Sequence, residues 1–285
     1  MDAEFEEKEF EALLNQQLCA HGSVFYAPGQ VLENIIGLDA ALTCQDTQFW
    51  KLFPGPKPQA LYPITPSPSG ILLSGEYWTG LDSALDHFPA IKFNLFVQHK
   101  RPAYLRSGSA RQWKYWKQPY YRYPLVSHQQ SALSHLAKIA QGDALVVYSC
   151  PAFISRADLW KHGFGSSLIS NTNFALVEGL DGHDEYTFVA PGSSGYACSE
   201  PAEIPPFSLA QEMQVRRSRE RATLSNKEFL HATAKYVLEA VRAADLGPSF
   251  EALFAFMPRD MTAIARSILT VHTFSAMTNS KWYLV

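Results

Sequence analysis

The stretch FNLFVQHK, residues 93–100, decides the fold that this sequence predicts. Phe93, Leu95 and Val97 alternate with the residues between them, which is the pattern of a β-strand with a strongly apolar face. Gln98 and Lys100 follow at its end, two positions apart. Side chains repeat with period two along a strand, so we expect both to point to the same side.

This strand end has the chemistry of a metal-and-water site. The amide oxygen of Gln98 and the backbone carbonyl of His99 can ligate a hard cation, and the ammonium of Lys100 can orient or help deprotonate a metal-bound water. The imidazole of His99 faces the other way and is expected to pack into the interior. A strand that runs into a polar loop would leave the same residues without a function, so the surroundings of the motif decide between the two interpretations.

Charge is unevenly distributed along the chain. The 285 residues are 47% hydrophobic, with a net charge of only −3, so they suggest one large domain or a domain with an accessory piece. Residues 87–142 nevertheless contain no Asp or Glu. Such segregation favours a positive surface that attracts a polyanion, unless folding disperses the charges. The basic residues in this window are Lys92, Lys100, Arg101, Arg106, Arg111, Lys114, Lys117, Arg122 and Lys138.

Several features favour a cytoplasmic protein. The four cysteines, Cys19, Cys44, Cys150 and Cys198, are far apart in sequence and form no C-x-x-C pair, which argues against a zinc knuckle and for a reducing compartment. No apolar run approaches the length of a membrane span. The N-terminal region is acidic, unlike a signal or transit peptide.

Two carboxylates lie upstream of this strand, one in a predicted helix and the other at the start of a predicted strand. Residues 3–20 predict a helix with acids on the face opposite its apolar residues. Glu33 lies in a second predicted helix, 29–36, and Asp39 lies at the start of a predicted strand, 38–43. A solvated helix face and a turn beside glycine would equally explain these two residues.

A proline-rich segment, 51–70, separates these residues from the strand and is predicted to be an irregular insertion. Asp82 and Asp86 follow it and compete with Asp39 for the role of metal ligand, because Asp86 is the acid closest before Gln98.

Basic and aromatic residues interleave after the strand, from 101 to 123. Cations contact phosphates, and aromatic faces stack on bases or lie against sugars. An aromatic-rich lid packed over the sheet would explain the same segment. The candidate nucleic-acid-binding residues are Arg101, Arg106, Arg111, Lys114, Lys117 and Arg122.

The segment that follows predicts a helix at 128–141, capped by Ser127, and a buried strand at 144–149. Residues 174–177 and 186–189 then predict a β-hairpin. Its turn holds His183, Asp184 and Glu185, which could bind a metal but are better explained as a plain polar turn.

The C-terminal part is predicted to be a helical accessory region beyond a proline-rich linker at 201–208. Ser225 and Glu228 form a capping box that opens an amphipathic helix to about residue 244. Two further helical stretches are expected near 249–256 and 260–276.

The order of these residues resembles the PD-(D/E)XK, or restriction-endonuclease-like, superfamily, in the branch where E-x-K becomes Q-x-K, as in Mrr-type restriction enzymes. The resemblance spans roughly residues 1–150 and rests on E-x-x-x-G-x-D at 33–39, Q-x-K at 98–100, and the later helix and strand with Gln129, Gln130 and Tyr148. It implies an α/β fold whose mixed central sheet is flanked by helices. The expected domains are a nuclease core at 1–175, a hairpin and linker at 176–206, and a helical region at 207–285.

The resemblance also implies a metal-dependent nuclease, most simply a DNA endonuclease of a restriction or anti-phage defence system. Mg²⁺ or Mn²⁺ would be held by Asp39, Gln98 and the carbonyl of His99, with Lys100 positioning the nucleophile and Glu33 ligating through water or a second ion. Double-stranded DNA is the expected substrate, and a homo-oligomer or an activating partner subunit is expected.

Two other classes of protein fit the same residues. A non-catalytic nucleic-acid- or partner-binding protein would keep the basic and aromatic segment without the metal site, and a structural subunit would turn that segment toward an acidic partner. The sequence holds no phosphate-binding G-x-x-x-x-G-K-[ST] loop, no G-x-S-x-G elbow and no H-E-x-x-H, so those enzyme classes find no support.

Overall fold

The computed structural model describes residues 1–20, 24–25, 82–83, 85–199, 201–219, 224–254 and 261–285. The chain forms two units. The first comprises residues 1–25, 93–219 and 278–285, and the second comprises residues 26–92 and 220–277.

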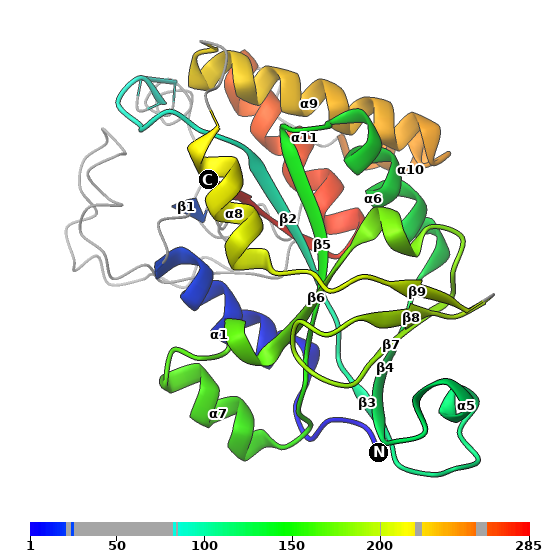
Figure 1. Ribbon diagram of the computed structural model, residues 1–285. Helices are drawn as coiled ribbons and strands as arrows, with labels where there is room; N and C mark the ends of the chain where they lie inside the picture. The colour runs from blue at the N-terminus through cyan, green and yellow to red at the C-terminus, as the bar shows by residue number, and fades with distance from the viewer. Residues whose placement is uncertain (21–23, 26–81, 84, 200, 220–223, 255–260) are drawn as a thin grey trace, which may run out of the picture. The chain divides into compact units, whose positions relative to one another are not determined.

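The first unit is built on a mixed five-stranded sheet in the order β1-β10-β2-β5-β6 (Figure 1). The two central strands, β2 (Asn94–His99) and β5 (Ala144–Pro151), are parallel, and Gln98 lies opposite Tyr148. All residues of both strands are buried, which agrees with the near-continuous apolar sequences of parallel strands covered on both faces. The remaining strands, all antiparallel to their neighbours, are β1 (Val24–Phe25), β10 (Ser280–Leu284) and β6 (Thr172–Leu176).

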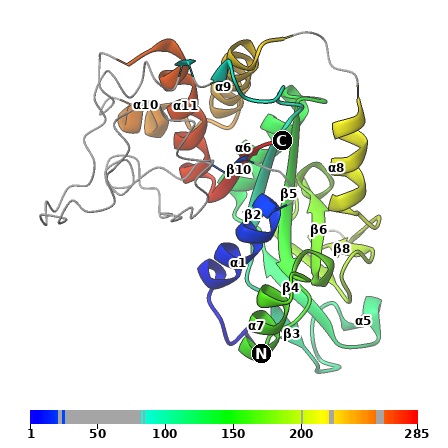
Figure 2. The ribbon, with the colours of Figure 1, turned by 90° about the vertical axis from the view of Figure 1, so that its left-hand side faces the viewer.

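Helices cover both faces of this sheet. On one face, α1 (Glu7–Ala20), α7 (Arg156–Phe164) and α8 (Leu209–Ser218) pack around one hydrophobic cluster, which includes Leu95, Val97 and Leu145 (Figure 2). The other face carries α6 (Ser127–Ile139), which lies between β2 and β5 in the sequence. A helix in the connection between two parallel strands is the expected crossover geometry.

A second, fully antiparallel sheet has the order β3-β4-β7-β8-β9. Tyr123 of β4 contacts Tyr148 of the first sheet, with ring centroids 5.8 Å apart, so aromatic packing joins the two sheets. The short helix α5 (Trp113–Trp116) lies in the connection between β3 and β4. The strands are β3 (Ala103–Leu105), β4 (Tyr120–Pro124), β7 (Glu185–Phe188), β8 (Gly195–Ala197) and β9 (Ala202–Ile204), and two 3₁₀ turns, η1 (Ile169–Asn171) and η2 (Val177–Leu180), flank β6.

The second unit is helical in its described part and contains α9 (Asn226–Ala243), α10 (Gly247–Phe254) and α11 (Ala263–Met277). The capping box predicted at Ser225 and Glu228 is confirmed at the start of α9. Asn226 then anchors the preceding segment, because its amide nitrogen donates to the carbonyls of Leu85 and Phe88. No helix in the described part of the chain has both the length and the apolar character that crossing a membrane requires.

Several local predictions were wrong. Helix α1 begins at Glu7 rather than at residue 3, and Glu11 lies on its buried face. Val126 occupies the N-cap of α6, so Ser127 is its first helical residue rather than its cap. The expected hairpin does not form, because β6 pairs with β5 in one sheet while β7 pairs with β4 and β8 in the other.

The predicted division at residues 175 and 206 also differs from the units of the structure. Residues 176–206 supply strands to the second sheet of the first unit, and part of the expected linker is β9. The strand β10 was missed, and it belongs to the first unit although the helices before it belong to the second. The strand expected at 38–43 and the proline-rich segment 51–70 lie outside the described residues.

Candidate functional site at the end of β2

Gln98 and Lys100 lie at the C-terminal end of β2 and are both buried. Only 1% of Gln98 and 7% of Lys100 is exposed. The backbone N–H of Lys100 donates to the carbonyl of Ser149 at 2.8 Å, which holds this strand end against β5. A lysine ammonium is rarely buried to this degree unless a partner or a function retains it.

The amide group of Gln98 is only half satisfied. Its Nε2 donates to Gln129 Oε1 on α6 and to the carbonyl of Thr278, each at 2.7 Å. A backbone carbonyl only accepts hydrogen bonds, so Thr278 fixes which end of the amide is the nitrogen. The Oε1 of Gln98 is then buried without a hydrogen-bond partner in the part of the chain that the structure describes. A buried unsatisfied acceptor costs about 1–3 kcal/mol, so this oxygen is an available ligand atom.

Lys100 interacts with an aromatic ring and, electrostatically, with a carboxylate. Its Nζ lies 5.4 Å from the centroid of the Tyr148 ring on β5, and Glu7, at the start of α1, interacts with it electrostatically. Glu7 is itself positioned by Asn279, whose Nδ2 donates to Glu7 Oε1 at 2.9 Å. Because Asn279 follows Thr278, the segment before β10 links Gln98 to the partner of Lys100.

Burial moves the pKa values of both charged groups toward neutrality. Desolvation lowers the pKa of the Lys100 ammonium, and the carboxylate of Glu7 opposes this shift. Desolvation likewise raises the pKa of Glu7, while Lys100 and the hydrogen bond from Asn279 oppose it. A lysine whose pKa is lowered exchanges a proton more readily at neutral pH than a surface lysine does.

A second polar cluster lies nearby and is structural. The Nδ1 of His99 and the Oγ of Ser149 are 2.8 Å apart, and Glu11 forms an ion pair with Lys281 at 3.0 Å. Burial lowers the pKa of His99 to about 4. Although Ser149, His99 and Glu11 are the residue types of a nucleophilic triad, they are 0%, 1% and 4% exposed. The ion pair of Glu11 with Lys281 joins α1 to β10, and the contact of His99 with Ser149 joins β2 to β5. His99 is packed in the interior, as its position in the strand predicted.

The predicted carboxylates divide into two groups. Glu33 and Asp39 lie outside the described residues. The competing acids already have partners within the second unit, because Asp82 Oδ1 accepts from the hydroxyl of Thr262 at 3.3 Å and Asp86 Oδ2 pairs with the ammonium of Lys227 at 2.8 Å.

Both edges of β2 are occupied by described strands. On one side β5 runs parallel, and on the other β10 runs antiparallel with Ser280 opposite Gln98. The strand beside the Q-x-K motif therefore contributes Ser280 and Lys281 at this level, preceded by Asn279, rather than a carboxylate. In the described ranges, the end of β2 included, no group of three or more His, Cys, Asp or Glu side chains could hold a metal ion.

Three of the six candidate nucleic-acid-binding residues are neutralised within the fold. Arg101 pairs with Glu6 at 3.2 Å, and Arg111 and Arg122 share Glu185, each at 3.4 Å. Glu185 is one of the three residues, with His183 and Asp184, that the sequence offered as a metal cluster or, preferably, as a plain polar turn. In the structure Glu185 is an ion-pair partner of two arginines. Within the described ranges, the other three cations, Arg106, Lys114 and Lys117, have no carboxylate at ion-pair distance.

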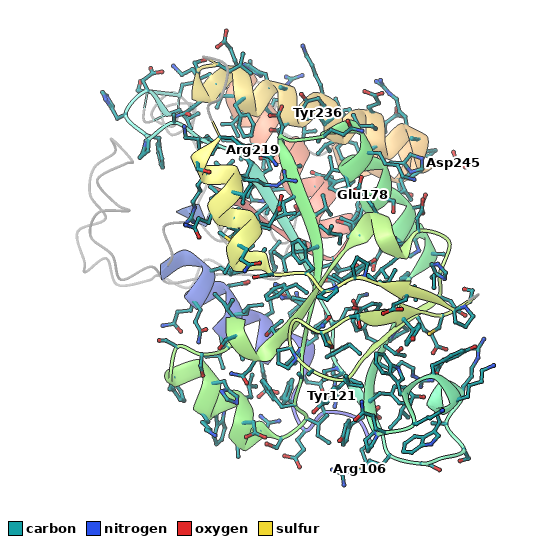
Figure 3. All side chains as sticks on the ribbon, viewed as in Figure 1. Arg106, Tyr121, Glu178, Arg219, Tyr236 and Asp245 are labelled. Carbon is teal, nitrogen blue, oxygen red and sulfur yellow. The ribbon has the colours of Figure 1, made fainter. Side chains whose placement is uncertain are left out.

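Arg106 illustrates how these unpaired cations lie on aromatic surface. Its guanidinium lies 5.0 Å from the ring centroid of Tyr104, and that ring contacts Tyr121 at 4.7 Å. Figure 3 shows Arg106 at the outer margin of the second sheet, with Tyr121 further in.

Sequence reasoning did not identify Glu7 or Asn279. The spacing of residues along α1 could have indicated Glu7. Glu7 and Glu11 are four residues apart, so they lie on the same side of the helix, next to the buried Phe10. No comparable signal marks Asn279, because its role depends on the pairing of β10 with β2.

Comparisons of the chain with protein-family models, with curated proteins and with solved structures found no significant match in any of the three.

Proposed function

We propose that this chain is a metal-dependent nuclease with a restriction-endonuclease-like core, acting on DNA in restriction or anti-phage defence. One observation carries the proposal. At the end of β2, the buried ammonium of Lys100 interacts electrostatically with the carboxylate of Glu7, and the amide oxygen of Gln98 is buried without a hydrogen-bond partner among the described residues. Buried polar groups with unused hydrogen-bonding capacity and shifted pKa values are typical of functional sites, which favours a catalytic use of this strand end.

The arrangement of elements supports the same proposal. After the Q-x-K strand and the intervening β3, α5 and β4, the chain continues with α6 and with β5, which is parallel to β2; the resemblance to Mrr-type enzymes implies such a later helix and strand. Gln129 of α6 reaches Gln98, and Tyr148 of β5 donates to Gln130. Gln129 and Tyr148, two of the residues on which the resemblance rests, are therefore neighbours of Gln98 and Lys100.

Phosphodiester hydrolysis needs an activated water and relief of negative charge at phosphorus. The oxygen of Gln98 fits the oxygen ligands that Mg²⁺ prefers. The sequence assigns the carboxylate ligands to Asp39 and Glu33, which lie outside the described residues. A Mg²⁺ ion held there would act as a Lewis acid and lower the pKa of a bound water. Lys100 would hold the attacking water or a phosphate oxygen at Nζ, and Glu7 would act as a positioning residue that sets the proton affinity of Lys100.

A second candidate function is a nucleic-acid-binding protein without catalysis. The exposed, unpaired cations on aromatic rings favour it, because they need no metal ion to bind a polyanion.

Plasmid cleavage in Mg²⁺, Mn²⁺ and EDTA tests the proposal on the full chain. We expect ion-dependent cleavage that falls by at least a hundredfold in Lys100→Ala and Asp39→Ala, about the scale of losing one proton-transfer or charge-stabilising group. Lys138→Ala is the matched lysine control, because Lys138 forms a surface ion pair with Asp181. Salt-dependent binding without cleavage under any ion condition would overturn the nuclease in favour of the second candidate.

The role of Glu7 has its own readout. Its carboxylate raises the pKa of Lys100, so Glu7→Gln should move the alkaline limb of the pH–rate profile to lower pH. Glu9→Gln changes a carboxylate of the same helix that pairs with Arg156 instead, so it should leave the profile unchanged. An identical profile in Glu7→Gln would remove Glu7 from the site.

A further inference from the structure

A cluster of aromatic residues lies on one face of the second sheet, around α5. We name the α5 cluster as Trp113–Lys117 together with Tyr196 of β8. The ring centroid of Tyr196 lies 5.5 Å from that of Tyr115 and 5.0 Å from that of Trp116. The ammonium of Lys114 lies 4.9 Å from the centroid of the Tyr115 ring. None of the four residues of α5 itself is buried: Lys114 is exposed, and the three aromatic residues are partly exposed.

The base of the α5 cluster is fixed by polar contacts. Gln112 is 2% exposed, accepts a hydrogen bond from the hydroxyl of Tyr120 at 2.9 Å and donates to Glu185 at 3.0 Å. The indole N–H of Trp116 donates to Thr187 Oγ1 at 3.0 Å. These contacts hold the connection in place before any ligand arrives, which lowers the entropic cost of binding.

The charges of the cluster are arranged for an anionic ligand. Glu185 is already shared by Arg111 and Arg122, as well as by Gln112. Lys114 and Lys117 have no carboxylate at ion-pair distance among the described residues, and both are exposed. Lys117 ends α5 with a φ of 51° and donates its backbone N–H to the carbonyl of Trp113 at 2.8 Å.

We propose that the α5 cluster binds unpaired nucleotides, with phosphates at Lys114 and Lys117 and a base stacked on Tyr115 or Trp116. Contacts to phosphates alone would be made equally well with a duplex. An aromatic side chain, in contrast, can stack only on a base that is free to leave the double helix. Uncharged partners would not use the two unpaired ammonium groups. The choice of a nucleic acid rests on the proposed function, and the proposal deepens it by assigning preference for single-stranded segments.

Fluorescence anisotropy of labelled oligonucleotides in EDTA tests this proposal without catalysis. The probes are an oligothymidine and a hairpin duplex with the same number of phosphates. Base stacking on an aromatic side chain contributes about 1–3 kcal/mol, so Tyr115→Ala should weaken oligothymidine binding by about five- to a hundredfold and leave duplex binding nearly unchanged. Lys114→Ala should reduce the salt slope for single strands by about 0.7.

Two control variants change the same residue types elsewhere in the first unit. Phe164→Ala removes an aromatic ring that is 81% exposed on α7, and Lys138→Ala removes a lysine that pairs with Asp181. Both should retain the preference for single strands. Equal affinity for the two probes, or an unchanged oligothymidine affinity in Tyr115→Ala, would overturn the proposal.

The outcome is independent of the nuclease test. Ion-dependent cleavage by a protein that shows no preference for single strands would remove the role of the α5 cluster and leave the proposed function standing. A preference lost in Tyr115→Ala, in a protein that never cleaves, would support the cluster and overturn the nuclease.

Discussion

Replacing Tyr148 by Phe tests whether α6 and β5 are joined as the candidate site requires. The hydroxyl of Tyr148 donates to Gln130 Oε1, and both residues are buried. Burial raises the pKa of Tyr148 far above its ordinary value, so the hydroxyl stays protonated and donates at any working pH. The substitution removes this donor and leaves the acceptor of Gln130 unsatisfied.

The expected loss follows from what remains in place. Gln130 Nε2 still donates to the carbonyl of Val177 at 2.9 Å and to Ser134 Oγ at 3.1 Å, so the amide cannot rotate to rescue its oxygen without losing those bonds. Leaving a buried acceptor unpaired costs about 1–3 kcal/mol. The phenyl ring keeps its contacts with Tyr123 and Lys100, so the packing contribution is retained.

Equilibrium unfolding in urea measures this loss as a lower midpoint at an unchanged slope. Tyr121→Phe is the matched control, because its hydroxyl has no hydrogen-bond partner among the described residues and the residue is only partly buried. Its effect should stay within about 0.5 kcal/mol. A loss in Tyr148→Phe no larger than in Tyr121→Phe would refute the inferred link between α6 and β5.

The remaining predictions concern the helical unit and the response to acid. Ser225→Ala removes one half of the capping box of α9 and should destabilise the second unit by about 1 kcal/mol. The loss is measured as a lower unfolding midpoint. Ser218→Ala should have little effect, because among the described residues the hydroxyl of Ser218 bonds only to the carbonyl of Val215 within its own helix. The pKa of His99 falls from 6.5 to about 4 on folding, so its contribution to stability is complete above pH 6.5 and is lost as the pH falls toward 4. That loss is about 3 kcal/mol, and urea midpoints across this range should fall less steeply in His99→Asn; an equally steep fall in the variant would contradict the assignment.

The sequence predicted the central strands well because their signals are local. Alternation at 93–97 and the apolar run at 144–149 correspond to β2 and β5, and the capping box at Ser225 fixes the start of α9. These features depend on residues within one turn or one strand, so no distant contact is needed to recognise them.

The errors concern contacts between distant segments. The sequence at 174–189 alternates like a hairpin, yet its two strands enter different sheets because β7 pairs with β4, some sixty residues earlier. Glu7 and Asn279 become neighbours only because β10 pairs with β2 across more than 180 residues. Such pairings are set by the tertiary fold and leave no local pattern in the chain.

The basic residues of the window 87–142 are partly neutralised by carboxylates from other parts of the chain. The window predicted a positive surface, but carboxylates from outside it, Glu6 and Glu185, neutralise Arg101, Arg111 and Arg122. Sequence segregation of charge therefore overestimated the surface available to a polyanion, and the accessible cations gather on aromatic rings instead.

The central claim is that Lys100 at the end of β2 serves phosphodiester hydrolysis. The most direct measurement is the rate at which supercoiled plasmid is nicked by the wild-type chain and by Lys100→Met, each in Mg²⁺ and in EDTA, with folding of the variant checked by its urea midpoint. We expect nicking by the wild type in Mg²⁺ only, and a rate at least a hundredfold lower in a folded Lys100→Met protein. Equal Mg²⁺-dependent nicking by both proteins would contradict it.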